Sequence, residues 1–141
     1  MERPFLGSHA ALFVGEKLLV ILRDDIPTIP SPNCWDFPGG TADAGETPFE
    51  TLQREVREEV SLHLPESALI WQKYYRSVNQ PDHFNWFYVA RLPATVHPEI
   101  ALGDEGQRWD LMTPDAFLSL ENVVPSFPPR LRDWMAGVAA D

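Results

Sequence analysis

The fold of this chain is decided by Gly39-Gly40-Thr41-Ala42-Asp43-Ala44-Gly45-Glu46 and, after seven further residues, Arg54-Glu55-Val56-Arg57-Glu58-Glu59. A glycine-rich turn runs into a segment in which acidic and basic side chains are crowded together. At about 100° per residue, Glu55, Glu58 and Glu59 gather on one flank of a helix, about 110° from its apolar side. The segment therefore predicts a helix that buries one face and presents carboxylates on another.

The start of this helix is marked by Thr47-Pro48-Phe49-Glu50. Thr47 suits the N-cap, Pro48 suits the first helical position, and Glu50 completes a capping box. We expect the helix to run to about Val60. Its apolar side is formed by Phe49, Leu52, Val56 and Val60.

The clustered carboxylates repel one another, because like charges at these spacings cost about 0.2–0.5 kcal/mol per pair. A hard cation such as Mg²⁺ would offset the repulsion, since it takes oxygen ligands and commonly shares them with substrate phosphates. Ion pairs with Arg54 and Arg57 would also offset it. A solvated acidic helix face is the third explanation, and the commonest use of surface charge. The spacing alone leaves all three open.

N-terminal to the glycine-rich turn, two apolar runs predict a pair of antiparallel strands. Residues 8–14 and 17–23 are separated by Gly15-Glu16, which fits a hairpin turn. Residues 24–33 contain three prolines and predict a surface loop near a site. Residues 34–37 then predict a short strand that leads into the glycines.

C-terminal to the helix, three further strands are expected. Residues 69–77 and 83–91 are rich in aromatic side chains, and residues 108–111 form a last short run. Thr113-Pro114 predicts a capped helix that extends to about Leu120.

A final helix is expected from Pro128 or Pro129, with one apolar face made of Leu131, Trp134, Met135 and Val138. Strands interleaved with helices predict an α+β fold, an α/β/α sandwich with a mixed β-sheet between helices.

Composition narrows the class of protein. A length of 141 residues fits one domain over 1–141, and the single cysteine, Cys34, excludes an internal disulfide and a cysteine-rich zinc site. We find neither a signal peptide nor an apolar run long enough to cross a bilayer, so a cytoplasmic location is expected. A formal charge of −10 repels nucleic-acid polymers. An acidic protein that handles phosphates needs divalent cations between the two negative partners.

From Gly40 to Leu62 the chain closely resembles the Nudix box, in which a glycine, five residues, a glutamate, seven residues and Arg-Glu-apolar-any-Glu-Glu follow in order. We place the box at about 40–62. The likeness extends to Asp36-Phe37-Pro38-Gly39-Gly40 and to Glu105-Gly106-Gln107, and the order resembles MutT-like pyrophosphohydrolases. Where the family has a glycine after the glutamates, this chain has Ser61, which adopts the left-handed conformation at a cost of about 1 kcal/mol.

The resemblance implies a set of site residues. Glu55, Glu58 and Glu59, with the backbone carbonyl of Gly39, would hold Mg²⁺, for which Mn²⁺ is a candidate substitute. Arg54 would pair with a glutamate and fix its rotamer. The general base would be Glu55, with Glu105 as the alternative base or an extra metal ligand. Glu46 is expected to support the loop and Arg54, or simply to face the helix dipole.

Substrate contacts are predicted for one arginine and three aromatic residues. Arg23 lies at a strand end where it could reach a phosphate, although a plain surface arginine fits equally well. Trp35, Phe84 and Trp86 could stack on a nucleobase, although large aromatics usually fill the core. The four histidines show no ligand spacing and receive no role.

The implied activity is magnesium-dependent hydrolysis of a diphosphate linkage in a nucleoside diphosphate derivative, with a nucleoside triphosphate giving monophosphate and pyrophosphate as the expected case. The partner would be a small nucleotide, and the protein a monomer or homodimer. One alternative is a catalytically silent nucleotide-binding module of the same fold. An isopentenyl diphosphate isomerase is disfavoured by the single cysteine and scattered histidines. An acidic interaction protein would release no phosphate from any nucleotide.

Overall fold

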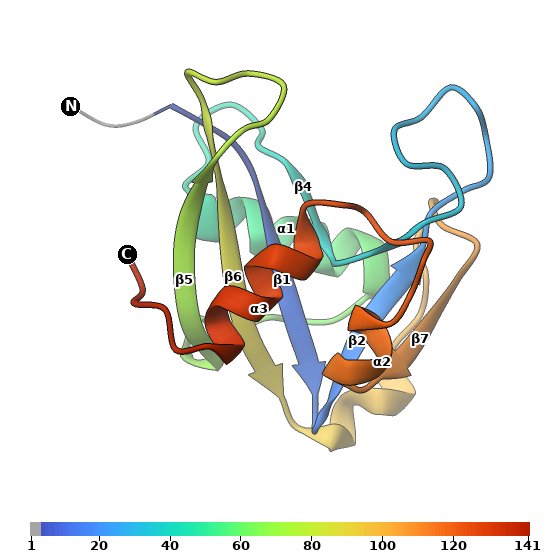
Figure 1. The fold of residues 1–141 in the computed structure, drawn as a ribbon. Coiled ribbons are helices and arrows are strands. Elements are labelled where there is room, and N and C mark those ends of the chain that lie inside the picture. The colour runs from blue at the N-terminus through green and yellow to red at the C-terminus, as the bar shows by residue number, and fades with distance from the viewer. Residues whose placement is uncertain (1–3) are drawn as a thin grey trace.

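The computed structural model describes residues 4–141, and its centre is a seven-stranded mixed sheet (Figure 1). The order along the sheet is β3-β2-β1-β6-β5, with β4 paired to β1 and β7 paired to β2. Only β1 and β6 run parallel, and the remaining pairs are antiparallel. The strands are β1 (Phe5–Val14), β2 (Lys17–Leu22), β3 (Trp35–Asp36), β4 (Gly39–Thr41), β5 (Leu69–Arg76), β6 (Phe84–Leu92) and β7 (Arg108–Met112).

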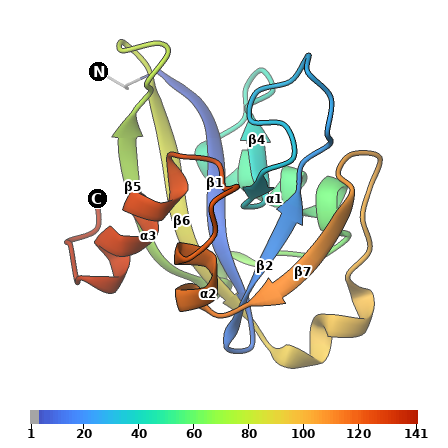
Figure 2. The same cartoon turned by 45° about the vertical axis from the view of Figure 1, so that its right-hand side comes forward.

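Helices cover both faces of this sheet, which confirms the predicted α/β/α arrangement. Helix α1 (Pro48–Val60) lies on one face, and α2 (Pro114–Leu118) and α3 (Phe127–Met135) lie on the other (Figures 1 and 2). Two 3₁₀ turns, η1 (Glu66–Ala68) and η2 (Ala94–Glu99), were not expected from the sequence. Within the described part of the chain, no helix has both the length and the apolarity needed to span a membrane.

The sheet separates two buried clusters because side chains alternate across each strand. On the α1 side, Leu12, Leu19 and Tyr88 pack against Leu52 and Val56 of the helix. The opposite cluster gathers Phe13, Phe37, Phe87, Phe117 and Leu131. Helix α1 is thus fixed by its apolar face, and its acidic flank is left free to face other groups.

The N-terminus of α1 has the predicted capping box. The Thr47 side chain accepts a hydrogen bond from the Glu50 amide, and the Glu50 carboxylate accepts one from the Thr47 amide, at 3.2 and 2.9 Å. At the other end, Ser61 adopts φ 65° and ψ 21°, the left-handed conformation expected of it. Its hydroxyl donates to the Ala101 carbonyl at 2.8 Å, a bond that glycine could not make and that offsets part of the backbone cost.

Strand β4 is a strand that sequence patterning does not predict. Its residues pair with β1 in antiparallel register, Ser8 opposite Gly40 and His9 opposite Gly39. Glycines have low strand propensity and no side-chain alternation, so the sequence of this segment predicts a turn and not a strand. The pairing matters because it anchors the glycines beside α1.

The predicted apolar face of the last helix was partly wrong. Leu131 is buried and Trp134 packs on the core, but Met135 and Val138 are 48% and 38% exposed. The helix ends at Met135 because Gly137 takes φ +78°. Val138 therefore lies outside the helix, where its carbonyl accepts a hydrogen bond from the Trp71 indole at 2.9 Å.

Candidate active site

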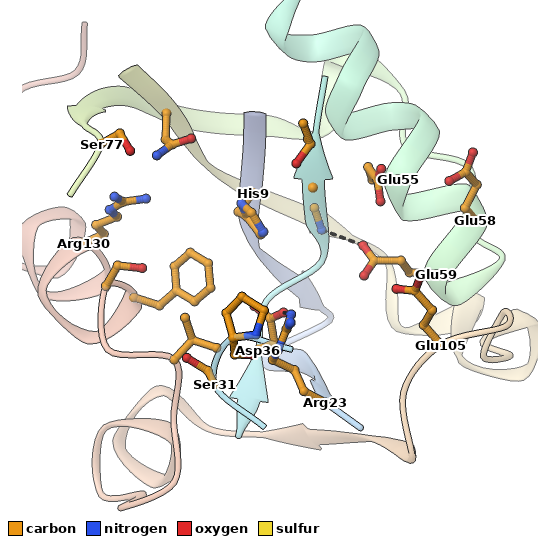
Figure 3. A pocket seen from close by; sticks show the side chains of 18 of the residues that line it. His9, Arg23, Ser31, Asp36, Glu55, Glu58, Glu59, Ser77, Glu105 and Arg130 are labelled. Atoms are coloured by element: carbon orange, nitrogen blue, oxygen red, sulfur yellow. Dashed lines mark hydrogen bonds and ion pairs between the residues drawn. The ribbon is translucent and has the colours of Figure 1, made fainter. Parts of the chain in front are cut away.

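A pocket of about 890 Å³ opens where β4, the acidic flank of α1 and the first turn of α3 converge. Figure 3 shows Glu55, Glu58, Glu59 and Glu105 along one side, Arg130 and Ser77 on the opposite side, and His9 between them. We call the side formed by these four glutamates the acidic wall. The size suits a nucleotide, because ligand pockets commonly hold about 300–1,000 Å³.

Glu59 is the most constrained member of the acidic wall. Its Oε1 accepts a hydrogen bond from the Gly39 amide at 2.8 Å, drawn in Figure 3. Burial raises the pKa of Glu59 to about 9, helped by the negative charges of Asp36, Glu55 and Glu105 and opposed by the Gly39 bond. A carboxylate placed in this way needs a positive partner before it can hold its charge at neutral pH.

Arg54 holds the other two α1 glutamates in place. Its Nη1 donates to Glu55 Oε1 at 2.8 Å and to Glu58 Oε2 at 3.2 Å. Burial raises the pKa of Glu55, and the hydrogen bond from Arg54 opposes that shift. The arginine is therefore a shared hydrogen-bond partner of both glutamates.

Glu46 forms an ion pair with Arg54 and lies outside the pocket lining. Its carboxylate accepts from Arg54 Nε at 2.7 Å, from the Asp43 amide at 2.7 Å and from the Thr51 hydroxyl at 3.0 Å. The hydrogen bond from Arg54, with that from the Asp43 amide, lowers the pKa of Glu46 to about 2. Glu46 thus ties the loop before α1 to the arginine.

Gly40 permits the close approach of strand β4 to this wall. A Cβ on Gly40 would lie 2.6 Å from the carboxyl carbon of Glu55, so any other residue would displace that carboxylate. Gly39 takes φ +146°, which L side chains rarely adopt. The acidic wall therefore requires a glycine at position 40, whereas at Gly39 the positive φ and the close approach of Ser8 and His9 of β1 exclude a side chain.

Arg23 lines the pocket, and its guanidinium already has partners. Its Nη1 pairs with Asp36 Oδ2 at 3.0 Å, and its Nε donates to the Pro30 carbonyl at 3.0 Å. Burial raises the pKa of Asp36 to about 6, while Arg23 opposes the shift. A phosphate contact by Arg23 stays a prediction.

The three aromatic residues predicted to stack on a base are absent from the pocket lining. Trp35 is 6% exposed and packs in the core under Arg108, whose guanidinium lies 4.9 Å from its ring centroid. Trp86 stacks on Tyr88 over α1, and Phe84 meets Tyr74 edge-on. The ring that does line the pocket is Phe127. Phe127 begins the proline-rich run Phe127-Pro128-Pro129-Arg130, which has no periodic signal, so the sequence marks the stretch but not this ring.

His9, which sequence reasoning left without a role, sits in the centre of the pocket. Its ring lies 5.0 Å from that of Phe127. Burial, with the positive charges of Arg130 and Arg23, lowers the pKa of His9 to about 3. The imidazole therefore stays neutral at physiological pH, which isolated spacing along the sequence could not reveal.

His9→Gln should make the metal-free protein less sensitive to acid. In the unfolded chain His9 takes up a proton below about pH 6.5, whereas the folded imidazole stays neutral down to about pH 3. Protonation therefore favours the unfolded chain below pH 6.5, and the free energy of unfolding is higher above that pH. When the pH is lowered from 7.5 to 5.5, the free energy of unfolding of the wild type should fall by about 1.4 kcal/mol more than that of the variant. Urea unfolding with chelator measures this, and parallel pH profiles would contradict the assignment.

The acidic wall offers oxygen donors of the kind that a divalent metal ion binds. Within residues 4–141, no three His, Cys, Asp or Glu side chains already lie together as a ready ligand set. Arg54 engages Glu55 and Glu58, and the Gly39 amide engages Glu59. The donor chemistry nevertheless fits a hard divalent cation, since the wall offers carboxylate oxygens and its buried member, Glu59, has no cationic partner among the described residues.

Comparison with known families agrees with the fold. The NUDIX domain model matches residues 6–135, so the chain belongs to the Nudix family. An RNA pyrophosphohydrolase from Francisella tularensis subsp. mediasiatica is 32% identical over 102 residues, which cover 66% of this chain and 57% of that protein. The chain thus spans little more than half the length of the relative.

Solved structures show the same fold at low identity. The MutT protein from Methanosarcina mazei superposes with a TM-score of 0.74 at 18% identity, covering 96% of both chains. A MutT NUDIX hydrolase from Burkholderia pseudomallei gives a TM-score of 0.69 at 22% identity, covering 93% of this chain and 98% of the other. The predicted family and fold class are therefore confirmed.

Proposed function

We propose that the protein hydrolyses a diphosphate linkage in a nucleotide-like substrate with Mg²⁺ as cofactor, for which Mn²⁺ would substitute. The observation that carries the proposal is the acidic wall. Glu55, Glu58 and Glu59 line one pocket with Glu105, beside Gly39 of β4, in a chain of the Nudix family. A nucleotide-binding module without activity has less need of so many carboxylates on one side of its pocket.

The residues can be given roles in that reaction. Glu55, Glu58, Glu59 and the Gly39 carbonyl would hold the cation, with Glu105 as an extra ligand. When bound, the cation would neutralise phosphate oxygens and favour ionisation of a water. A water oxygen forms a bond to phosphorus while the bridging P–O bond breaks, and a Glu55 carboxylate oxygen accepts the water's proton. Glu105 is the alternative base. Arg54 acts as a positioning residue, because it holds Glu55 and Glu58.

A nucleoside triphosphate, giving monophosphate and pyrophosphate, is the substrate we favour. The 5′-triphosphate end of an RNA is the second candidate, because several curated relatives are named RNA pyrophosphohydrolases. The formal charge of −10 favours the small nucleotide over the polymer. We further propose a monomer or homodimer, one domain over 1–141, and a cytoplasmic location.

A substrate panel tests the proposal. Nucleoside triphosphates, diphospho-sugars, dinucleotides and a 5′-triphosphate RNA would be incubated with Mg²⁺, with Mn²⁺ and with chelator, and the products separated by anion exchange. We expect cation-dependent cleavage of a nucleoside triphosphate to monophosphate and pyrophosphate. Faster cleavage of the RNA would favour the second candidate. Binding of nucleotides without any cleavage, at any cation concentration, would favour the silent module.

A further inference from the structure

Arg130 is a buried cation at the side of the pocket that faces the acidic wall. It lies in the first turns of α3 and is 7% exposed. Its guanidinium carbon stands 4.7 Å from the Tyr75 ring centroid and 5.9 Å from that of Phe127. The guanidinium is thus held between two aromatic rings, and it lines the pocket.

The charge of Arg130 has no counter-ion among residues 4–141. No carboxylate lies within ion-pair distance of its guanidinium, and no carbonyl or side chain of the described residues accepts a hydrogen bond from it. The acid nearest along the helix, Asp133, instead accepts a hydrogen bond from the Tyr75 hydroxyl at 2.8 Å. A largely buried charge without an anionic partner is costly in free energy, and an anion bound in the pocket would offset that cost.

Uncharged polar side chains line the pocket together with Arg130. Ser77, Asn79, Asn85 and Ser126 offer hydroxyl or amide groups as donors, and Ser77 lies on the same side of the pocket as Arg130 (Figure 3). Neutral His9 lies between this region and the acidic wall (Figure 3). The first turn of α3 adds the positive end of its dipole. The pocket therefore has an anionic side for cations and a separate cationic side.

We propose that Arg130 forms a second anion subsite, which takes a phosphate group of the substrate other than the diphosphate facing the acidic wall. The proposal takes the nature of the substrate from the proposed function and rests on it to that extent. A guanidinium binds phosphate oxygens bidentately, and the phosphate would supply the missing charge. A nucleobase edge would supply hydrogen-bond acceptors without charge, and would leave the buried cation unpaired. The protein should therefore prefer substrates that carry a further phosphate beyond that diphosphate, as a nucleoside triphosphate does.

Binding of inorganic phosphate without divalent cations tests the subsite independently of catalysis. With chelator present, the acidic wall repels phosphate, so phosphate should bind only at Arg130. In an NMR titration, added phosphate should shift the Arg130 Nε–H signal and the signals of Ser77 and Ser126. Arg130→Gln should weaken phosphate binding at least tenfold, and Arg130→Lys should retain part of it. Arg132→Gln, an exposed arginine of the same helix, is the matched control and should change the affinity less than twofold.

Unchanged phosphate affinity in a folded Arg130→Gln protein would overturn the subsite, and circular dichroism of both glutamine variants controls for folding. Weaker binding of adenosine or guanosine, with phosphate binding unchanged, would show that Arg130 contacts a base and would also overturn it. If phosphate binds at Arg130 but no substrate in the panel is cleaved, the proposed function fails and the subsite stands.

Inhibition kinetics distinguish a substrate phosphate from free phosphate acting as a regulator. Inorganic phosphate should compete with substrate in the wild type and inhibit at least tenfold more weakly in Arg130→Gln. Non-competitive inhibition that disappears in Arg130→Gln would mean that the subsite takes free phosphate, contrary to the proposal.

Discussion

Glu59→Gln is expected to lower cation-dependent turnover by about 10³-fold and to leave the fold intact. The amide keeps the shape of the side chain and can still accept the hydrogen bond from the Gly39 amide. It cannot carry the negative charge that a cation requires, and loss of a ligand removes several kcal/mol of stabilisation from the transition state, at about 1.4 kcal/mol per tenfold in rate. Steady-state kinetics with Mg²⁺ measures the loss.

Stability without metal gives the same variant a readout that does not depend on activity. Folded Glu59 keeps its proton up to about pH 9, whereas the unfolded side chain loses it above pH 4.5, so wild-type stability falls as pH rises through that range. In chelator, Glu59→Gln should therefore become increasingly more stable than the wild type from pH 5 to pH 8. Glu121→Gln, an exposed glutamate outside the pocket, serves as the control. A folded Glu58→Gln, Glu59→Gln double variant with full activity would refute the metal assignment.

Arg54→Gln should lower the free energy of unfolding by about 2–3 kcal/mol, because it leaves several acceptors without a partner. The Arg54 side chain is only 24% exposed, and it bridges the loop to α1 through Glu46, Glu55, Glu58 and the Thr41 carbonyl. Turnover should also fall, since Glu55 loses its fixed position. Arg57→Gln is the matched control, as Arg57 is exposed on the same helix, and its effect should stay within about 0.5 kcal/mol. Equal urea midpoints for the two variants would contradict the bridging role.

The sequence was most informative where local chemistry determines structure. The capping box at Thr47 and the left-handed Ser61 follow from local rules, and the apolar side of α1 follows from periodicity, so these predictions were confirmed. Strand β4 escaped prediction because its pairing with β1 is a long-range contact made by glycines. The end of α3 was misplaced because helix periodicity alone does not show where Gly137 reverses the chain.

The same difference between local and long-range contacts decides which site residues could be predicted. Glu55, Glu58 and Glu59 could be placed together from helical spacing and family resemblance, since they lie on one helix. The pocket's other side depends on tertiary packing. His9 on β1 and Arg130 on α3 are far apart in sequence, and only the fold brings them to one pocket. Trp35 and Trp86 illustrate the converse, because aromatic composition does not distinguish a base-stacking ring from a core side chain.

Paramagnetic Mn²⁺, titrated into isotope-labelled protein without substrate, measures most directly whether the acidic wall binds a divalent cation. We predict that amide signals of Gly39, Gly40 and the second half of α1 broaden first, and that the effect disappears in the Glu58→Gln, Glu59→Gln double variant. Broadening centred elsewhere, for example at the ion pair of Lys73 and Asp141, or unchanged in the double variant, would contradict the account.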